Sequence, residues 1–187
     1  MNEPAVNYIS MDLQAGFRTQ AVHVWLFTLA VVFVWVGLIV GAPLLTALGI
    51  PELSSPLYLF FSYICHQIPE RSLDLAAHQM AVCSRCFGVY GGLLTGIAIY
   101  PLWRPIDEVE PIPRFWLFLA LIPVALDWSL TAFGIWENTH VSRLITGLIL
   151  GFACATFIVP AVVEVVRHLS ARRRPGIKKT ASPGGLH

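Results

Sequence analysis

The chain has 187 residues, of which 56% are hydrophobic and only 12% are charged. Soluble domains usually carry about 25% charged residues, so this composition excludes an ordinary soluble enzyme or binding domain and indicates an integral membrane protein. The formal net charge of +1 gives no general reason to expect nucleic-acid binding, and four cysteines are too few for a disulfide scaffold.

Long apolar segments predict four membrane-spanning helices, because a helix needs about 20 apolar residues to cross the hydrocarbon core. The predicted spans are residues 22–48, 83–103, 114–135 and 143–168. The first is too long for the apolar part of a signal peptide, so we expect it to be retained, with room for a break at Gly41-Ala42-Pro43. The apolar run 57–64 is too short to cross and follows a Ser-Ser-Pro helix start, which predicts a short helix at the membrane interface.

These elements predict an all-α, multi-pass protein of the cell membrane: a four-transmembrane-helix bundle with a short interfacial helix in the first outer loop. We expect residues 1–21 to form a cytoplasmic N-terminal segment and residues 22–168 to form the membrane domain. Residues 169–187 are expected to be a basic, disordered cytoplasmic tail. The expected partner of the whole bundle is the lipid bilayer.

The positions of the basic residues predict the orientation. Four spans place both termini on one side of the membrane. Of the 12 Lys and Arg residues, only Arg71, Arg85 and Arg143 fall on the other side. Because cytoplasmic segments are enriched in Lys and Arg, we expect both termini to be cytoplasmic and these three arginines to face outward.

Two of the predicted spans carry small residues at every fourth position. The second contains Gly88, Gly92 and Gly96, and the fourth contains Gly147 and Gly151. Stripes of this kind let helix backbones approach closely in lipid. We expect the two spans to contact each other, or each to form a similar contact with another chain in a homo-oligomer or with another membrane protein.

Three of the four cysteines lie between positions 65 and 86, on the predicted outer side. Cys83 and Cys86 are three positions apart at the start of the second span, so a helix would place both sulfurs on one face. The positive end of the helix dipole stabilises a thiolate there, and thiolate is the form that binds metal or attacks a disulfide. Cys65, which is followed by His66, lies 18 positions before Cys83 in the sequence.

A metal site is the leading hypothesis for this cluster. Three thiolates and one imidazole are a standard zinc ligand set, so Cys65, Cys83, Cys86 and one histidine are expected to bind zinc, with iron as a weaker candidate. The spacing leaves both His66 and His78 open as the fourth ligand. Four protein ligands would make the site structural, whereas an open position could support hydrolysis, so the sequence does not decide whether the protein is an enzyme.

Two other functions fit the same residues. Cys83 and Cys86 could be the redox pair of a quinone-linked membrane thiol-disulfide oxidoreductase, with Cys65 as the partner thiol. Such enzymes usually use two cysteine pairs, and Cys154 lies too deep in the fourth span to complete a second one. In the third hypothesis the cysteines only organise helix ends, and the protein is a structural subunit of a membrane assembly.

Polar residues within or beside the spans are expected to surround this site. Asp127 lies inside the third span, where a carboxylate is costly and needs a partner or a function. Arg85 and Arg143 enter from the outer ends of their spans and could reach it, and Asn138 lies in the adjacent loop. Asp127 would then either tie spans together by an ion pair or support a ligand in the site. His140 is expected to be a surface loop residue.

The segments "CHQIPERS", "CSRCFGVYGG" and "NTHVSRLITGLILG", together with Asp127, resemble a family of small predicted bacterial and archaeal multi-pass membrane proteins of unknown function. The family pattern runs Cys-His-Gln, then Cys-x-Arg-Cys-x-Gly-x-Tyr, then a membrane Asp. The resemblance covers roughly residues 57–151 and implies that His66, rather than His78, belongs to the motif, but it implies no activity. The matching positions are Cys65, His66, Gln67, Glu70, Arg71, Ser72, Cys83, Arg85, Cys86, Gly88, Tyr90, Gly92, Asp127, Asn138, Arg143, Thr146 and Gly147.

Overall fold

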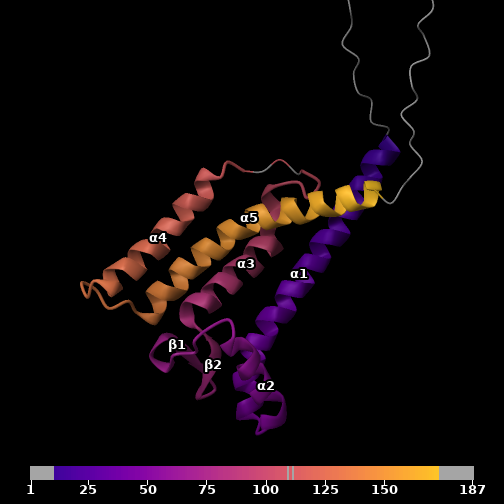
Figure 1. Cartoon of the computed structure of the whole chain (residues 1–187). Helices are drawn as coiled ribbons and strands as arrows, with labels where there is room; N and C mark the ends of the chain where they lie inside the picture. The colour runs from indigo at the N-terminus through magenta and orange to yellow at the C-terminus, as the bar shows by residue number, and fades with distance from the viewer. Residues whose placement is uncertain (1–10, 109, 111, 173–187) are drawn as a thin grey trace, which may run out of the picture.

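The structure, a computed structural model, describes residues 11–108, 110 and 112–172 (Figure 1). It is mainly helical, and four of its helices, α1, α3, α4 and α5, are long and apolar enough to cross a membrane. The all-α, multi-pass prediction is therefore confirmed. The helices are α1 (Met11–Ala47), α2 (Pro51–Ser62), α3 (Ser84–Trp103), α4 (Phe115–Ala132) and α5 (His140–Arg172). A 3-10 turn (Pro69–Arg71) and a hairpin of β1 (Ser72–Leu75) and β2 (His78–Cys83) complete the described elements.

The ends of α1 and α4 differ from the predicted spans for local reasons. α1 is not interrupted at Gly41-Ala42-Pro43. It continues through the buried Pro43 to Ala47. α1 and α4 are then ended by Gly49 and Gly134, whose φ angles are +72° and +68°. At the second of these ends, the Ile135 N–H bonds the Leu130 carbonyl at 3.0 Å and the Gly134 N–H bonds the Thr131 carbonyl at 3.1 Å. This is the Schellman pattern, which favours glycine.

The N-terminal part of α1 and the C-terminal part of α5 lie at the same end of the bundle (Figure 1). Gln20 Nε2 donates a hydrogen bond of 2.7 Å to Ser170 Oγ there, and the α3–α4 connection joins the same end through Arg167, which bonds the Asp107 carbonyl. The hairpin, α2 and the α4–α5 turn lie at the opposite end (Figure 1). Residues 1–10 and 173–187, which include most of the predicted basic tail, lie outside the described residues.

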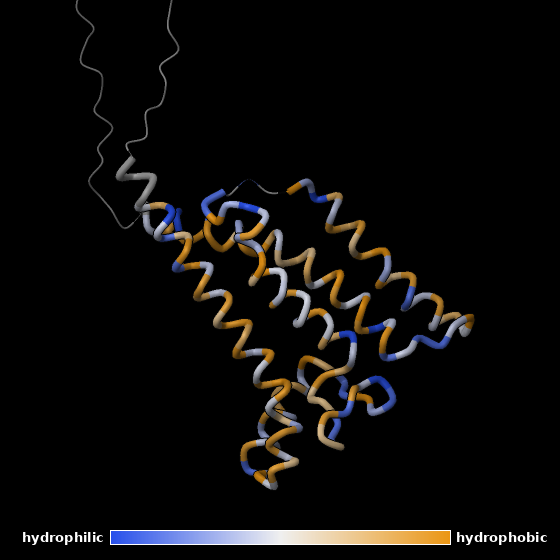
Figure 2. Tube along the Cα trace, turned by 180° about the vertical axis from the view of Figure 1, so that it is seen from behind, coloured by the Kyte–Doolittle hydropathy of each residue, from blue (hydrophilic) through white to orange (hydrophobic). Residues whose placement is uncertain are grey.

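The exposed sides of the spanning helices suit a lipid environment. Figure 2 shows mostly hydrophobic residues along the spanning helices, and hydrophilic residues concentrated at the two ends and in the hairpin. Large apolar side chains remain exposed on α1 and α4, among them Phe27 at 71% and Phe118 at 66%. Such exposure would be unfavourable in water but is expected where lipid covers the helix.

α3 and α5 form the most extensive helix contact, and their glycines make it possible. A Cβ atom added at Gly92 or Gly151 would lie closer than 3.0 Å to backbone atoms of the facing helix, as would one at Gly88 or Gly147. At Gly96 the obstruction is the side chain of Ala155. The glycines of α3 and those of α5 therefore face each other within one chain. They give no separate reason to expect contact with a second chain.

A small core at the hairpin end positions the cysteine motif. α1 packs against α2, α3 and β2 there. The buried residues of this core are Ile39, Ala42, Phe61, Cys65, Met80, Ala81 and Val82. Cys65 thus belongs to a packed cluster, and its side chain is directed away from solvent.

The sequence did not predict the hairpin. β1 and β2 pair antiparallel, with Ser72 opposite Cys83 and Leu75 opposite His78. The two connecting residues, Ala76 and Ala77, have φ angles of +53° and +63°. This is the backbone of a tight two-residue turn that normally carries Asn-Gly or Asp-Gly, so the usual sequence signal is absent. The register brings Cys83 back to the start of α3.

Candidate functional site

Three thiols meet at the N-terminal end of α3. The sulfur atoms of Cys65, Cys83 and Cys86 lie within 4.8 Å of one another, and all three cysteines are free. They come from three local structures: the loop after α2, the last residue of β2, and the first turn of α3. Only Cys65 is fully buried, and the other two are partly accessible. Residues 21 positions apart in the chain are thus brought together by the hairpin.

The start of α3 supplies positive polarisation to this group. The backbone N–H of Cys83, which caps the helix, donates a hydrogen bond of 3.2 Å to Cys65 Sγ. An N–H at this position has no partner within the helix, and it carries part of the positive helix-dipole charge. Hydrogen bonds from the thiols of Cys83 and Cys86 hold the pKa of Cys65 far below its ordinary value, although burial opposes this shift. The arrangement favours a thiolate at Cys65.

Two glutamines fix the loop that carries Cys65 to the hairpin. Gln67 Nε2 donates to the carbonyls of Tyr58 at 2.8 Å and Ala81 at 2.9 Å, so it joins α2 to β2. Gln79 Nε2 in turn donates to the Gln67 carbonyl at 2.6 Å. Gln67 adopts a φ of +47°, an unusual value for a non-glycine residue, which these bonds help to maintain. From the sequence, Gln67 is recognised only as part of the family motif, and Gln79 has no predicted role.

The histidines do not complete the group of thiols. His66 is exposed and His78 is half-buried on β2. Among the described residues, no histidine or carboxylate joins the three cysteines within the same 4.8 Å limit. The predicted fourth ligand, His66, is therefore outside the cluster in this arrangement. The reason is the chain direction: the side chain of Cys65 is directed into the core, and that of its neighbour is directed outward.

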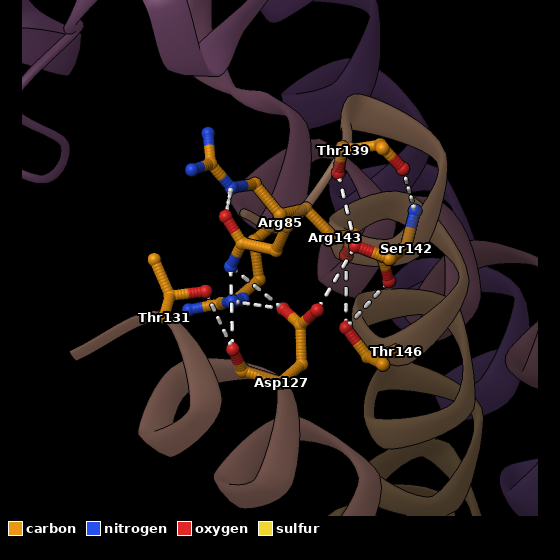
Figure 3. Close-up of polar contacts among 8 residues, drawn as sticks. Arg85, Asp127, Thr131, Thr139, Ser142, Arg143 and Thr146 are labelled. Atoms are coloured by element: carbon orange, nitrogen blue, oxygen red, sulfur yellow. Dashed lines mark hydrogen bonds and ion pairs between the residues drawn. The ribbon is translucent and has the colours of Figure 1, made fainter. Parts of the chain in front are cut away.

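Asp127 is the centre of a polar cluster beside the thiols (Figure 3). Its carboxylate forms an ion pair with Arg85 of α3, with Asp127 Oδ2 as the acceptor. The same oxygen accepts a hydrogen bond of 3.0 Å from Asn138 Nδ2, and Oδ1 accepts one of 2.9 Å from Ser142 Oγ. Thr131 Oγ1 donates to the Asp127 carbonyl at 2.9 Å. Residues of α3, α4 and α5 are thus joined through one carboxylate.

Arg143 reaches this cluster indirectly. Its Nε donates a hydrogen bond of 2.7 Å to Asn138 Oδ1, and Asn138 bonds Asp127 (Figure 3). Of the two arginines expected to reach Asp127, only Arg85 pairs with it. Among the described residues, Asp127 makes no hydrogen bond or ion pair with a histidine, so the structure gives no support to its predicted alternative as a partner of a ligand histidine.

His140 has a partner that its loop position did not suggest. Its Nδ1 lies 2.8 Å from Ser84 Oγ, and Ser84 Oγ lies 3.0 Å from the Arg71 carbonyl. A carbonyl can only accept, so the hydroxyl proton goes to Arg71 and the His140 Nδ1–H donates to Ser84. His140 therefore ties the start of α5 to the start of α3, and the expectation of a simple surface residue is wrong.

A cavity of about 390 Å³ connects the thiols to the polar cluster. Cys83 and Cys86 line one part of it, and Asn138 and Trp128 line another. Arg71, Arg85 and Arg143 also line it, so its charged side chains are all cationic. Arg85, Asn138 and Arg143 were predicted to surround the site, whereas Arg71 had no predicted function. One sequence signal could have predicted that Arg71, Arg85 and Arg143 lie together. Of all Lys and Arg residues in the sequence, these three alone fall on the predicted outer side.

Comparisons with known proteins identify a family and two relatives. The family described as Predicted membrane protein (DUF2085) matches residues 65–157, which include the three thiols and the Asp127 cluster. Uncharacterized protein MJ1492 of Methanocaldococcus jannaschii is 42% identical over 110 residues, which are 59% of this chain and 70% of that protein. An uncharacterized protein of Methanothermobacter thermautotrophicus is 34% identical over 109 residues, 58% of this chain and 92% of that protein. No solved structure matches. The chain belongs to the DUF2085 family of predicted membrane proteins.

Proposed function

We propose that the protein binds one zinc ion through the thiolates of Cys65, Cys83 and Cys86. The observation that carries this proposal is the mutual approach of the three sulfurs to within 4.8 Å. In a tetrahedral zinc site with Zn–S bonds of about 2.3 Å, the sulfurs stand about 3.8 Å apart. Closing the cluster around an ion therefore requires sulfur movements of about 1 Å or less.

The charges around the cluster support this ligand set. Three thiolates and one divalent cation leave one net negative charge. The N-terminus of α3 and the guanidinium groups of Arg85 and Arg143, which line the adjoining cavity, oppose that charge. The loop that carries Cys65 is held by Gln67, and such supporting hydrogen bonds keep metal ligands oriented.

The fourth coordination position determines what the ion can do. His66 is the predicted protein ligand, and its exposed position would require the loop to turn its side chain inward. We favour a water ligand instead, because Cys83 and Cys86 both line the cavity, from which solvent can reach the ion. An open position of this kind is typical of zinc sites that act on a substrate.

Elemental mass spectrometry of the untagged, detergent-purified protein, prepared without chelator, tests the metal proposal. We expect close to one zinc per chain. Cys65→Ser and Cys86→Ser should lose it, whereas Cys154→Ser, on α5 and outside the cluster, should retain it. A native protein without metal, whose three clustered thiols titrate as reduced, would overturn the proposal.

Two histidine variants then distinguish a site with water as the fourth zinc ligand from a site with His66 as the fourth ligand. With water as the fourth ligand, His66→Ala and His78→Ala should both keep one zinc with similar affinity. If only His66→Ala weakens zinc binding, by about tenfold or more, His66 is a ligand and the site is closed. Competition with a fluorescent zinc chelator measures both affinities.

Thiol redox chemistry is the second candidate, and one observation favours it. Cys83 and Cys86 lie three residues apart at the N-terminus of α3 and both line the cavity. Oxidation would form a Cys83–Cys86 disulfide and release two electrons and two protons, which a quinone would accept. The test is the mass of the intact protein before and after incubation with a soluble quinone. Loss of two hydrogens, absent in Cys83→Ser, with quinol formed in equal amount, would support this function over zinc binding.

We further propose that this site faces the outside of the cell membrane and that both chain ends are cytoplasmic. The Lys and Arg distribution supports this orientation. Glu137 and Asp107 are exposed in connections at opposite ends of the bundle. An impermeant maleimide added to intact cells should label Glu137→Cys, and it should label Asp107→Cys only after permeabilisation. The reverse pattern would invert the topology.

A further inference from the structure

We propose that the cavity beside Cys83 and Cys86 binds a phosphate-type oxyanion, carried either by a small soluble molecule or by a lipid headgroup. The cavity has a volume of about 390 Å³, within the range of about 300–1,000 Å³ that is usual for small-ligand sites. It is large enough to hold more than the anion alone. This proposal concerns the arginines of the cavity and does not depend on a metal at the thiols.

Three guanidinium groups converge on the cavity from different parts of the chain. Arg71 ends the 3-10 turn before β1, Arg85 lies in the first turn of α3, and Arg143 lies in the first turn of α5. Of these three arginines, only Arg85 has a carboxylate partner among the described residues, and that partner is Asp127. Like charges repel one another at such a site, so their accumulation needs a compensating anion.

The arginines retain unused hydrogen-bond donors. The Nε of Arg85 is buried and has no hydrogen-bond partner. Toward the described residues, Arg143 donates only through its Nε, to Asn138, and both terminal nitrogens make no hydrogen bond (Figure 3). The side chain of Arg71 makes no hydrogen bond or ion pair with any described residue. Guanidinium groups bind phosphate through paired N–H donors, and this geometry suits an oxyanion better than a single halide ion.

Negative groups of the protein do not neutralise all of the positive charge of the three arginines. Asp127 neutralises one of the three arginines. A zinc ion on three thiolates would contribute one further negative charge next to the cavity. One positive charge remains in that case, and one also remains if no metal is bound and Cys65 alone is a thiolate. An oxyanion that bridges Arg71 and Arg143 would supply both the missing charge and the missing acceptors.

Binding of inorganic phosphate to the purified full-length protein tests the proposal, by equilibrium dialysis with radiolabelled phosphate. Arg71→Gln is the informative variant, because Arg71 is exposed and its loss leaves no buried partner unpaired. We expect its affinity for phosphate to fall about tenfold or more, which corresponds to about 1.4 kcal/mol. Arg114→Gln is the matched control, since it removes one exposed arginine at the other end of the bundle. Its affinity should stay unchanged.

A second arm identifies the source of the anion. The protein is placed in nanodiscs of phosphatidylcholine alone or with phosphatidic acid, and bound lipid is measured after detergent extraction. Selective retention of phosphatidic acid that Arg71→Gln loses and Arg114→Gln keeps would assign a lipid headgroup. Phosphate binding with the same dependence and no lipid retention would assign a soluble ligand. If neither probe binds, or if both variants lose binding equally, the proposal is wrong.

The zinc proposal fails or succeeds independently. Zinc content should be unchanged in Arg71→Gln. Phosphate binding in Cys65→Ser should stay within a few-fold of the native value, because Cys65 does not line the cavity. If both variants remain folded, as judged by their elution in size-exclusion chromatography, and each loses both ligands, the assignment of two separate sites is wrong.

Discussion

Arg85 on α3 is paired with Asp127 on α4, although these two helices otherwise make few direct contacts. Both carboxylate oxygens of Asp127 are already engaged, by Arg85, Asn138 and Ser142. The hydrogen-bonding capacity of this carboxylate is therefore used within the bundle, by donors from α3, α5 and the α4–α5 connection. Asp127 therefore acts as an anchor that holds α4 to the bundle and fixes the Arg85 guanidinium at the cavity.

Asp127→Asn should destabilise the protein by about 2 kcal/mol, because it leaves the Arg85 charge without its partner in a partly buried position. Denaturant unfolding in detergent micelles measures this change. The double variant with Arg85→Gln should lose less than the sum of the two single variants, as expected for residues in direct contact. Glu164→Gln removes an exposed carboxylate paired with His168 and should change stability by less than about 0.5 kcal/mol. Additive losses would show that the pair contributes nothing.

Two adjacent glycines of α3 should differ sharply in tolerance. A Cβ at Gly92 would collide with the backbone of Leu148, whereas one at Gly91 would lie 3.5 Å from the flexible Leu148 side chain. Gly92→Ala must therefore push α3 and α5 apart, and we expect a loss of about 3 kcal/mol. Gly91→Ala should be close to neutral. Thermal denaturation followed by size-exclusion chromatography compares them, and equal behaviour would contradict the packing described above.

Gln67→Leu should weaken zinc binding about tenfold while the protein remains folded. The substitution removes both side-chain bonds that tie the Cys65 loop to Tyr58 and Ala81, and ligand-supporting bonds are typically worth 10–100-fold in affinity. Gln20→Leu breaks the bond to Ser170 at the opposite end of the bundle and is the matched control. Chelator competition measures both, and an unchanged affinity in Gln67→Leu would remove Gln67 from the site.

Substitutions in the turn between β1 and β2 should be able to stabilise the hairpin. Ala76 and Ala77 both have positive φ angles, which cost an L-residue with a Cβ about 1 kcal/mol each. Replacing them by Asn-Gly should stabilise the hairpin by about 1 kcal/mol. Ala77→Val should destabilise it, since a β-branched residue fits this conformation poorly. Hydrogen exchange of the β1 and β2 amides reports the change, and slower exchange in Ala77→Val would contradict the turn geometry.

Local properties of the sequence determined the helices and part of the site. Span length depends only on the number of consecutive apolar residues, so four spanning helices could be predicted directly. The proximity of Cys83 and Cys86 follows from helical spacing, and the need of Asp127 for a partner follows from its position in an apolar segment. The break that the sequence left open near Pro43 does not form, and α1 continues through this buried residue.

Only the tertiary structure decided which distant groups meet. The Ala-Ala turn gave no hairpin signal, yet it returns Cys83 to Cys65. The positive φ of Gln67 sets the course of the chain after Cys65, whose side chain is buried while that of His66 is exposed. The approach of α3 to α5 brings Arg85 and Arg143 to one cavity, and the docking of α4 selects Arg85 as the partner of Asp127. These outcomes depend on side-chain direction and helix packing, which spacing along a chain does not specify.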